Sequence, residues 1–358
     1  MKSIFAATKC ALFHPPNSRK MTDRKQTIID ALDVLRKRDV ADKAVFSARA
    51  YAKVITELKA LTTPITTYED LSAITGIGAK MEKKIKEILE TGQLAAAEKA
   101  KELYNIDALD AFQKIYGVGP TKASDLVADG YTTIKQLREA VLKTPKLLND
   151  KQKVGLKYYE ELLERIPREE MEEHKDILEG LKPDEMETYE TEVVGSFRRG
   201  AQNSGDIDVL IRVPPKTKPK TAKDALSTYV KVLEGFGYIE EVLALGEHKC
   251  MAISRMFKGK ARRLDLLMTP DEEYAYALLY FTGSDRFNVA FRQYALDKGY
   301  TLNEHALTAI RTDVEAVPYM QTEKDIFKFL GLRYIEPSKR VGPEQILPAR
   351  LRPKVAPN

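Results

Sequence analysis

The stretch GSFRRGAQNSGDIDVLI, from Gly195 to Ile211, combines two arginines, two Gly/Ser pairs and an Asp-x-Asp, and it ends in an apolar run. One interpretation is a polar loop that leads into a buried strand. The other is a site that holds a polyphosphate and its metal ions. If DIDVLI is a strand, Asp206 and Asp208 project from the same face, because residues i and i+2 of a strand do so.

Two adjacent carboxylates repel each other unless a cation lies between them. Mg²⁺ is the usual cation where phosphates complete the ligand shell. A lone Asp-x-Asp is weak evidence for a metal site, since such a motif more often has no role in metal binding. A third acid, Asp265 in RRLDLLM, strengthens the metal interpretation, although an edge-strand or capping role would also explain it. Three strand aspartates together would form a two-metal site for in-line phosphoryl transfer.

The residues just upstream of these acids can bind phosphate. Glycine permits close approach of backbone N–H groups, serine adds a hydroxyl donor, and arginine adds a charged fork. A Gly/Ser hairpin would explain the glycines but not their neighbours. We therefore expect the segment to bind a metal–nucleoside triphosphate complex, through Gly195, Ser196, Arg199, Ser204 and Gly205.

An internal repeat lies nearer the N-terminus. ITGIGAKMEKKIKEIL (74–89) and IYGVGPTKASDLV (115–127) share a Gly-apolar-Gly core followed by lysine and a helix. Such glycines let backbone N–H groups face a phosphate, and these contacts position nucleic acid without reading its sequence. One copy would equally be an ordinary helix hairpin. Two copies favour binding of the DNA backbone at these turns. The glycines are Gly76, Gly78, Gly117 and Gly119, and the lysines that follow them in the sequence are Lys80, Lys83, Lys84 and Lys122.

Two further features are less specific. Lys84 lies among other cations, and a partly desolvated lysine can act as an amine nucleophile, but a solvated helix lysine is the commoner case. The segment 280–304 places Asn288 and Arg292 four residues apart on one helix face. Both side chains can hydrogen-bond base edges, although an exposed helix after a loop would show the same pattern.

The composition limits the class of protein. The 358 residues are 43% hydrophobic and 31% charged with a net charge of +5, which is typical of a soluble globular protein and permits nucleic-acid binding. The two cysteines exclude a disulfide framework, and the four scattered histidines have no zinc-site spacing. No apolar run is long enough to span a membrane. Residues 1–22 are basic and lack acids, as in a mitochondrial presequence or a disordered tail.

The apolar pattern changes along the chain from helical periodicity to strand alternation and back to helices. We expect an α+β protein with N-terminal all-helical modules, then a mixed sheet, then a C-terminal helical subdomain. The expected divisions are a basic tail or presequence (1–22), a helical domain with the first Gly-apolar-Gly turn (23–101), a helical DNA-binding subdomain with the second turn (102–165), a catalytic subdomain (166–275), a nucleotide-selection subdomain (276–340) and a tail (341–358).

Together these motifs resemble the family X DNA polymerases. The resemblance covers residues 27–336 and rests on GIGAKMEKKI, YGVGPTKA, GLKYYEELLERIPREEM, GSFRRG…SGDIDVLI, RRLDLL and YFTGSDRFN. It implies a helical lyase domain with helix-hairpin-helix motifs, a nucleotidyltransferase-type palm and a fingers-like C-terminal subdomain. It also implies filling of short gaps in base excision repair, with deoxyribose-phosphate lyase activity.

The resemblance assigns roles by matching positions. Asp206, Asp208 and Asp265 would bind two Mg²⁺ ions, for which Mn²⁺ can substitute, and Asp265 would accept the primer 3′-hydroxyl proton. Lys84 would form the Schiff base. The incoming nucleotide would contact Ser196, Arg199, Ser204, Gly205, Tyr280, Phe281, Gly283, Asp285 and Asn288. DNA would contact Lys80, Arg263, Arg292 and the glycines Gly76, Gly78, Gly117 and Gly119, where a monovalent cation commonly bridges to phosphates. Arg263 would also lie beside Asp265 and influence its charge.

Three positions depart from the family pattern. Lys43-Ala44 stands near the place of a His-Lys pair, Leu267 stands where some members have an arginine, and the Pro/Lys loop 214–224 looks longer than expected. This loop predicts an extra contact with DNA or a partner.

We expect gapped or nicked DNA and dNTPs as substrates, and other base excision repair proteins as candidate partners. We also expect a monomer with no membrane association, located in the mitochondrion or alternatively the nucleus. A template-independent terminal transferase and a non-catalytic DNA-binding scaffold are the rival functions.

Overall fold

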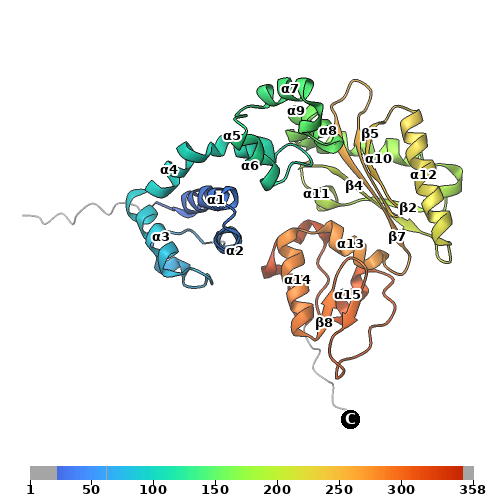
Figure 1. Ribbon diagram of the computed structural model, residues 1–358. Coiled ribbons are helices and arrows are strands. Elements are labelled where there is room, and N and C mark those ends of the chain that lie inside the picture. Colours follow the sequence, from blue (N-terminus) through green and yellow to red (C-terminus); the bar gives the residue numbers. More distant parts are fainter. Residues whose placement is uncertain (1–21, 62, 350–358) are drawn as a thin grey trace, which may run out of the picture. The chain divides into compact units, whose positions relative to one another are not determined.

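The computed structural model describes residues 22–61 and 63–349 and forms two compact units, Met1–Asp107 and Ala108–Asn358 (Figure 1). The proposed presequence, residues 1–22, lies outside the described residues except for its last position. Among the described residues, no helix combines the length and the apolar character that crossing a bilayer requires.

The first unit is helical. It contains α1 (Lys25–Ala41), α2 (Val45–Ala60), α3 (Ala79–Thr91) and α4 (Ala95–Tyr104). Apolar residues at helical spacing turn inward, as the periodicity predicts. The buried residues include Ile28, Leu32, Leu35, Val54, Leu58, Ile85 and Ile88.

The second unit begins with five helices: α5 (Ile106–Gln113, which spans the division), α6 (Pro120–Ala128), α7 (Ile134–Lys143), α8 (Asp150–Lys157) and α9 (Tyr159–Leu163). Helix α8 starts with a capping box between Asn149 and Gln152. Its Gly155 packs so closely on the preceding turn that a Cβ atom would lie 2.3 Å from the Tyr116 carbonyl oxygen. This close approach requires glycine.

A five-stranded mixed sheet follows, in the order β2–β4–β7–β6–β5. Its strands are β2 (Glu190–Val193), β4 (Ile207–Val213), β5 (Ile239–Leu245), β6 (Lys249–Ser254) and β7 (Arg262–Pro270). Strands β4 and β7 pair in parallel, and the other neighbours pair antiparallel. A small ladder joins β1 (Ile166–Pro167) to β3 (Asn203–Ser204).

The two faces of the sheet pack against different elements. On one face, Ile207, Val209 and Ile211 form a core with α10 (Arg168–Gly180) and α12 (Pro219–Gly235), and Figure 1 shows both helices on that face. On the other face, Leu210 and Leu267 pack against α13 (Tyr274–Thr282). Since strand residues alternate between faces, Asp208 shares the α13 face with Leu210, and Asp265 shares it with Leu267.

The C-terminal part contains α13, α14 (Asp285–Asp297), β8 (Tyr300–Leu302), β9 (Leu307–Ala309) and α15 (Glu323–Phe329). Phe287, Phe291 and Phe327 form its aromatic core. The expected tail from residue 341 is partly ordered, because Ala349 donates to the Gly331 carbonyl at 2.8 Å and Leu332 forms a bridge with Pro348. Residues 350–358 lie outside the described residues.

The Pro/Lys loop is shorter than the sequence suggested. Helix α12 begins at Pro219, so the loop ends at Lys218 rather than continuing to residue 224. Proline was read as a mark of a loop, but it is also favoured in the first turn of a helix, where its missing N–H is not needed.

Candidate active site

Asp208 and Asp265 are neighbours across the parallel ladder between β4 and β7. Both side chains therefore project from the same face of the sheet. Asp265 is 6% exposed. Burial, followed by the charge of Asp265, raises the pKa of the Asp208 carboxyl to about 6. Two acids held side by side in this way suit a positively charged ligand.

The third aspartate, Asp206, lies just before β4 rather than within it. Its carboxylate pairs with the Arg263 guanidinium. We expected Arg263 to act on Asp265, but the cation paired with Asp265 is Lys249, whose Nζ lies 2.8 Å from Oδ2. In this conformation, the part of the chain that the structure describes contains no ready-made cluster of three His, Cys, Asp or Glu side chains for a metal.

The residues nevertheless fit a divalent cation at the Asp208–Asp265 pair. Oδ1 of Asp265 is buried and has no hydrogen-bond partner among the described residues. Buried polar atoms normally have partners, so this oxygen is a free ligand position. Asp206 would join the pair only after leaving Arg263.

The two serine segments expected to bind phosphate come together. Helix α11 (Gly195–Arg198) follows β2 directly, and the Ser196 hydroxyl donates to the Ser204 hydroxyl oxygen at 3.0 Å. Gly195 has φ +62°, and a Cβ atom there would lie 3.3 Å from Oδ2 of Asp208. Glycine is required for this conformation, and its lack of a side chain leaves the space beside the carboxylate open.

Six of the nine predicted nucleotide residues line one cavity, whereas Ser196 and Ser204 are absent from its lining and Gly205 lines a different cavity. The first of these cavities has a volume of about 340 Å³ and includes Gly195, Asp208, Arg199, Arg292 and the predicted α13–α14 residues Tyr280, Phe281, Gly283, Asp285 and Asn288. Arg199 donates to the Thr282 carbonyl at 2.6 Å, and the Asn288 amide donates to the Tyr280 carbonyl at 2.7 Å. Arg199 and the residues of α13 and α14, which lie more than 80 positions later in the chain, therefore share a cavity with the catalytic candidate Asp208.

Arg198 has a role that sequence reasoning missed. Its guanidinium donates to Glu323 of α15 at 2.8 Å and to the Thr282 hydroxyl at 2.6 Å. Arg340, which is 1% exposed, pairs with the same carboxylate. Arg198 thus ties α11 to the C-terminal helices rather than facing solvent.

A second missed residue is Arg165, which precedes β1. It donates to the Asn203 side chain at 2.8 Å and to its carbonyl at 2.9 Å. A Cβ atom at Gly205 would lie 2.9 Å from Nη1 of Arg165. The arginine therefore adds positive charge beside the predicted phosphate residues. The available signal was its place in the motif GLKYYEELLERIPREEM.

The two Gly-apolar-Gly turns have the same backbone form. Gly76 and Gly117 have φ of +89° and +81°, and Gly78 and Gly119 are the N-caps of α3 and α6. A Cβ atom at either N-cap would meet nothing within 4 Å, so both backbones are accessible. These are the features that phosphate binding by backbone N–H groups needs.

The second turn lies near the carboxylates. It lines a cavity of about 540 Å³ that contains Tyr116, Gly117 and Gly119 together with Gly205 and Arg263. A strand of nucleic acid held by this turn would therefore pass Arg263, the partner of Asp206. The first turn belongs to the other unit.

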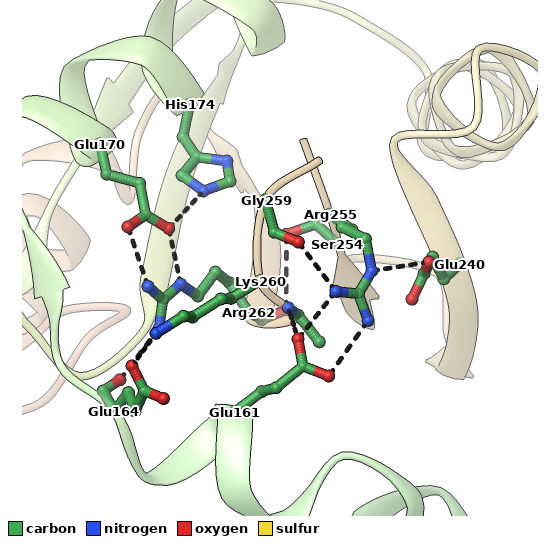
Figure 2. Close-up of polar contacts among 11 residues, drawn as sticks. Glu161, Glu164, Glu170, His174, Glu240, Ser254, Arg255, Gly259, Lys260 and Arg262 are labelled. Atoms are coloured by element: carbon green, nitrogen blue, oxygen red, sulfur yellow. Dashed lines mark hydrogen bonds and ion pairs between the residues drawn. The ribbon is translucent and has the colours of Figure 1, made fainter. Parts of the chain in front are cut away.

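Charged contacts fix the start of β7 against α9 and α10 (Figure 2). Glu161 accepts from Arg255 at 2.7 Å and from the Ala261 backbone N–H at 2.6 Å. Glu170 accepts two hydrogen bonds from Arg262, at 2.6 and 2.8 Å. Because β7 carries Asp265, these contacts hold the aspartate in place relative to the helices that precede the sheet.

In the first unit, Lys84 is half-buried on α3, while Lys80 and Lys83 are exposed. The Lys84 ammonium donates to the Lys80 carbonyl at 3.3 Å. The role of Lys84 stays a prediction.

Sequence models of known families match most of the chain. They are a helix-hairpin-helix domain (residues 23–94), the fingers domain of DNA polymerase lambda (110–163), the DNA polymerase beta palm (165–271) and the DNA polymerase beta thumb (277–341). The order of a helical region, a palm sheet and a C-terminal helical subdomain is as expected. The name of the C-terminal subdomain differs from the expected one. The resemblance implied a fingers-like subdomain, whereas the model that matches there is the thumb. We use fingers for 110–163, palm for 165–271 and thumb for 277–341 below.

Several curated proteins are similar to this chain. DNA polymerase lambda of Rattus norvegicus is 33% identical over 340 residues, which are 91% of this chain and 58% of the relative. DNA polymerase lambda of Arabidopsis thaliana is 28% identical and DNA nucleotidylexotransferase of Xenopus laevis 29%, over 92% and 89% of this chain and 63% and 69% of those proteins. The chain therefore spans only about three fifths of the two lambda polymerases.

Four adjoining domain matches and these relatives place the chain in family X of the DNA polymerases.

Proposed function

We propose that the chain is a DNA-directed DNA polymerase that fills short gaps in base excision repair. The observation that carries the proposal is the in-register pair Asp208 and Asp265, one of which lines the same cavity as Arg199 and the residues of α13 and α14. This arrangement puts acids for metal-assisted phosphoryl transfer beside a pocket with a cation for phosphates and a wall for a nucleoside.

Each group in the pocket has a separable task. Arg199, Ser196 and Ser204 bind the triphosphate by charge and hydroxyl donation, and Gly195 leaves room for it beside Asp208. Tyr280, Phe281 and Gly283 form the wall along the sugar, and Asp285 and Asn288 lie along the base. Asp265, with its unpartnered Oδ1, accepts the proton of the primer 3′-hydroxyl. Divalent cations, when bound by the aspartates, stabilise the charge on the transferring phosphoryl group.

The second helix-hairpin-helix turn supports a gapped DNA substrate. It shares its cavity with Arg263, so it can hold the primer backbone on the approach to the aspartates without reading the sequence. The first turn, with Lys80, is proposed to hold the other end of a gap. A monovalent cation held at each turn would add positive charge for a DNA phosphate.

We further propose that Lys84 gives the first unit 5′-deoxyribose-phosphate lyase activity. Its amine attacks C1′ of the abasic sugar, water leaves as the Schiff base forms, and β-elimination breaks the C3′–O bond. Lys80, four residues earlier on the same helix, binds the 5′-phosphate.

A template-independent terminal transferase is the rival function, favoured by the similarity to DNA nucleotidylexotransferase. Primer extension separates the two. On a one-nucleotide gap we expect addition of the complementary deoxynucleotide with Mg²⁺ and much slower extension of single-stranded DNA. Equal extension of both substrates would favour terminal transfer, and no extension with Mg²⁺ or Mn²⁺ would favour a DNA-binding scaffold.

The compartment is proposed from composition alone. The basic, acid-free residues 1–22 would direct a tagged full chain to mitochondria. Nuclear localisation that is unchanged by removing residues 1–22 would reject this proposal.

A further inference from the structure

Lys249 begins strand β6 and lies opposite Leu267 in the antiparallel ladder with β7. Its ammonium reaches back along the sheet face to Asp265, 2.8 Å from Oδ2. The Asp265 side chain is 8% exposed and the Lys249 side chain is 43% exposed. A buried acid is thus paired with a cation whose side chain is partly exposed.

Lys249 reduces the electrostatic repulsion between Asp208 and Asp265. Asp208 lies next to Asp265 across the ladder, and two such carboxylates repel unless a cation accompanies them. Arg263 pairs with Asp206 and not with Asp208 or Asp265. Within the described residues, the cation that contacts the Asp208–Asp265 pair is Lys249, through Asp265.

The geometry also allows Lys249 to leave. The lysine side chain is long and flexible and binds through a single compact charge, whereas an arginine fork would hold a carboxylate in two places. Only Oδ2 is engaged, since Oδ1 has no partner within the described part of the chain. A divalent cation could approach Oδ1 first and then take the place of the ammonium.

We propose that Lys249 is a displaceable counter-cation, which neutralises Asp265 in the metal-free protein and competes with divalent cations for that carboxylate. The proposal rests on the metal-binding role of Asp265 given under the proposed function. Lys249 is a positioning residue, because it acts through Asp265 and not on the substrate.

The test is Mn²⁺ binding by the full chain alone, without DNA or nucleotide, measured from the free-ion signal in electron paramagnetic resonance. We expect loss of this ion pair to change the Mn²⁺ affinity by a factor of about 5–30, which corresponds to about 1–2 kcal/mol. Lys249→Met should therefore bind Mn²⁺ about 5–30-fold more tightly than wild type. Lys249→Arg, which keeps the charge, should not bind it more tightly.

A matched control removes one positive charge elsewhere. Lys231→Met alters an exposed lysine on α12, which packs on the opposite face of the sheet, and it should leave Mn²⁺ affinity unchanged. Thermal unfolding gives a second readout: Lys249→Met should lower Tm in EDTA, and the difference from wild type should shrink with saturating Mn²⁺.

Unchanged or weaker Mn²⁺ affinity in Lys249→Met overturns the proposal. Asp265→Asn distinguishes this failure from failure of the proposed function. If Asp265→Asn loses Mn²⁺ binding while Lys249→Met matches wild type, only the role of Lys249 is rejected. If neither wild type nor Lys249→Met binds Mn²⁺, both the proposal and the metal role of Asp265 are rejected.

Discussion

Arg198 of α11 and Glu323 of α15 form an ion pair at 2.8 Å, and this pair connects the palm to the thumb across 125 residues of sequence. Glu323 is 5% exposed and also accepts from the buried Arg340. Arg198 is directly followed by Arg199 of the nucleotide cavity. The position of the thumb is therefore coupled to the segment that we propose binds the triphosphate.

Glu323→Gln should destabilise the protein by about 3 kcal/mol or more, because it leaves the buried Arg340 charge without its carboxylate and leaves Arg198 with only the more distant Glu192. Urea unfolding measures the change. Lys328→Ala, which alters an exposed lysine on the same helix, should change stability by about 0.5 kcal/mol or less. A Glu323→Gln effect as small as that of the control would show that the ion pair is not needed for stability.

His174 predicts a dependence of stability on pH. It is fully buried between Tyr238 (Nδ1 to hydroxyl, 2.7 Å) and Glu170 (3.6 Å), and burial lowers its pKa to about 4. Between pH 6.5 and 4 the unfolded chain binds a proton that the folded chain does not, so stability falls as pH falls. The contribution lost between pH 7.5 and pH 5 is about 2 kcal/mol.

Urea unfolding at several pH values checks this prediction. His174→Gln cannot titrate there, so its stability should change with pH less steeply than that of wild type. Identical slopes in the two proteins would reject the assignment to His174.

Gly155→Ala should weaken binding of gapped DNA without affecting the lyase step. A methyl group there would lie 2.3 Å from the Tyr116 carbonyl oxygen, so α8 or the second helix-hairpin-helix turn must shift, at a cost of about 1–3 kcal/mol. Fluorescence anisotropy with a labelled gapped duplex measures the affinity.

Gly180→Ala is the matched control, because a methyl group there meets nothing within 4 Å. If Gly155→Ala binds gapped DNA as tightly as Gly180→Ala, the turn does not hold the DNA in the way we propose.

Lys84→Ala should abolish most borohydride trapping of the protein on a 5′-deoxyribose-phosphate substrate, since the trapped species is the reduced Schiff base. Lys86→Ala, which removes a neighbouring lysine paired with Glu82, should trap as wild type does. Trapping by Lys84→Ala at the wild-type level would mean that another amine is the main nucleophile.

The sequence predicted which residues belong to the site better than it predicted which residues they contact. The alternation in DIDVLI and RRLDLLM reflects which residues are buried, so the strands and their acids could be found locally. The pairing of β4 with β7, which puts Asp208 opposite Asp265, depends on contacts between strands that are distant in sequence. No local pattern reports such a register.

Arg198 and Lys249 were missed for the same reason. Their partners Glu323 and Asp265 lie on other elements, and a charged residue in a short motif reads as exposed unless its partner is known. The family resemblance implied that Arg263 lies beside Asp265, yet its side chain pairs with Asp206. The α12 start at Pro219 was missed because proline favours both loops and first helical turns.

The most direct test of the account is extension of a primer across a one-nucleotide gap with Mg²⁺, comparing wild type with Asp265→Asn. Wild type should add the complementary deoxynucleotide, and Asp265→Asn should be slower by at least about a thousandfold while still binding the gapped DNA. Extension by Asp265→Asn within about tenfold of wild type would contradict the proposed role of the Asp208–Asp265 pair in nucleotidyl transfer.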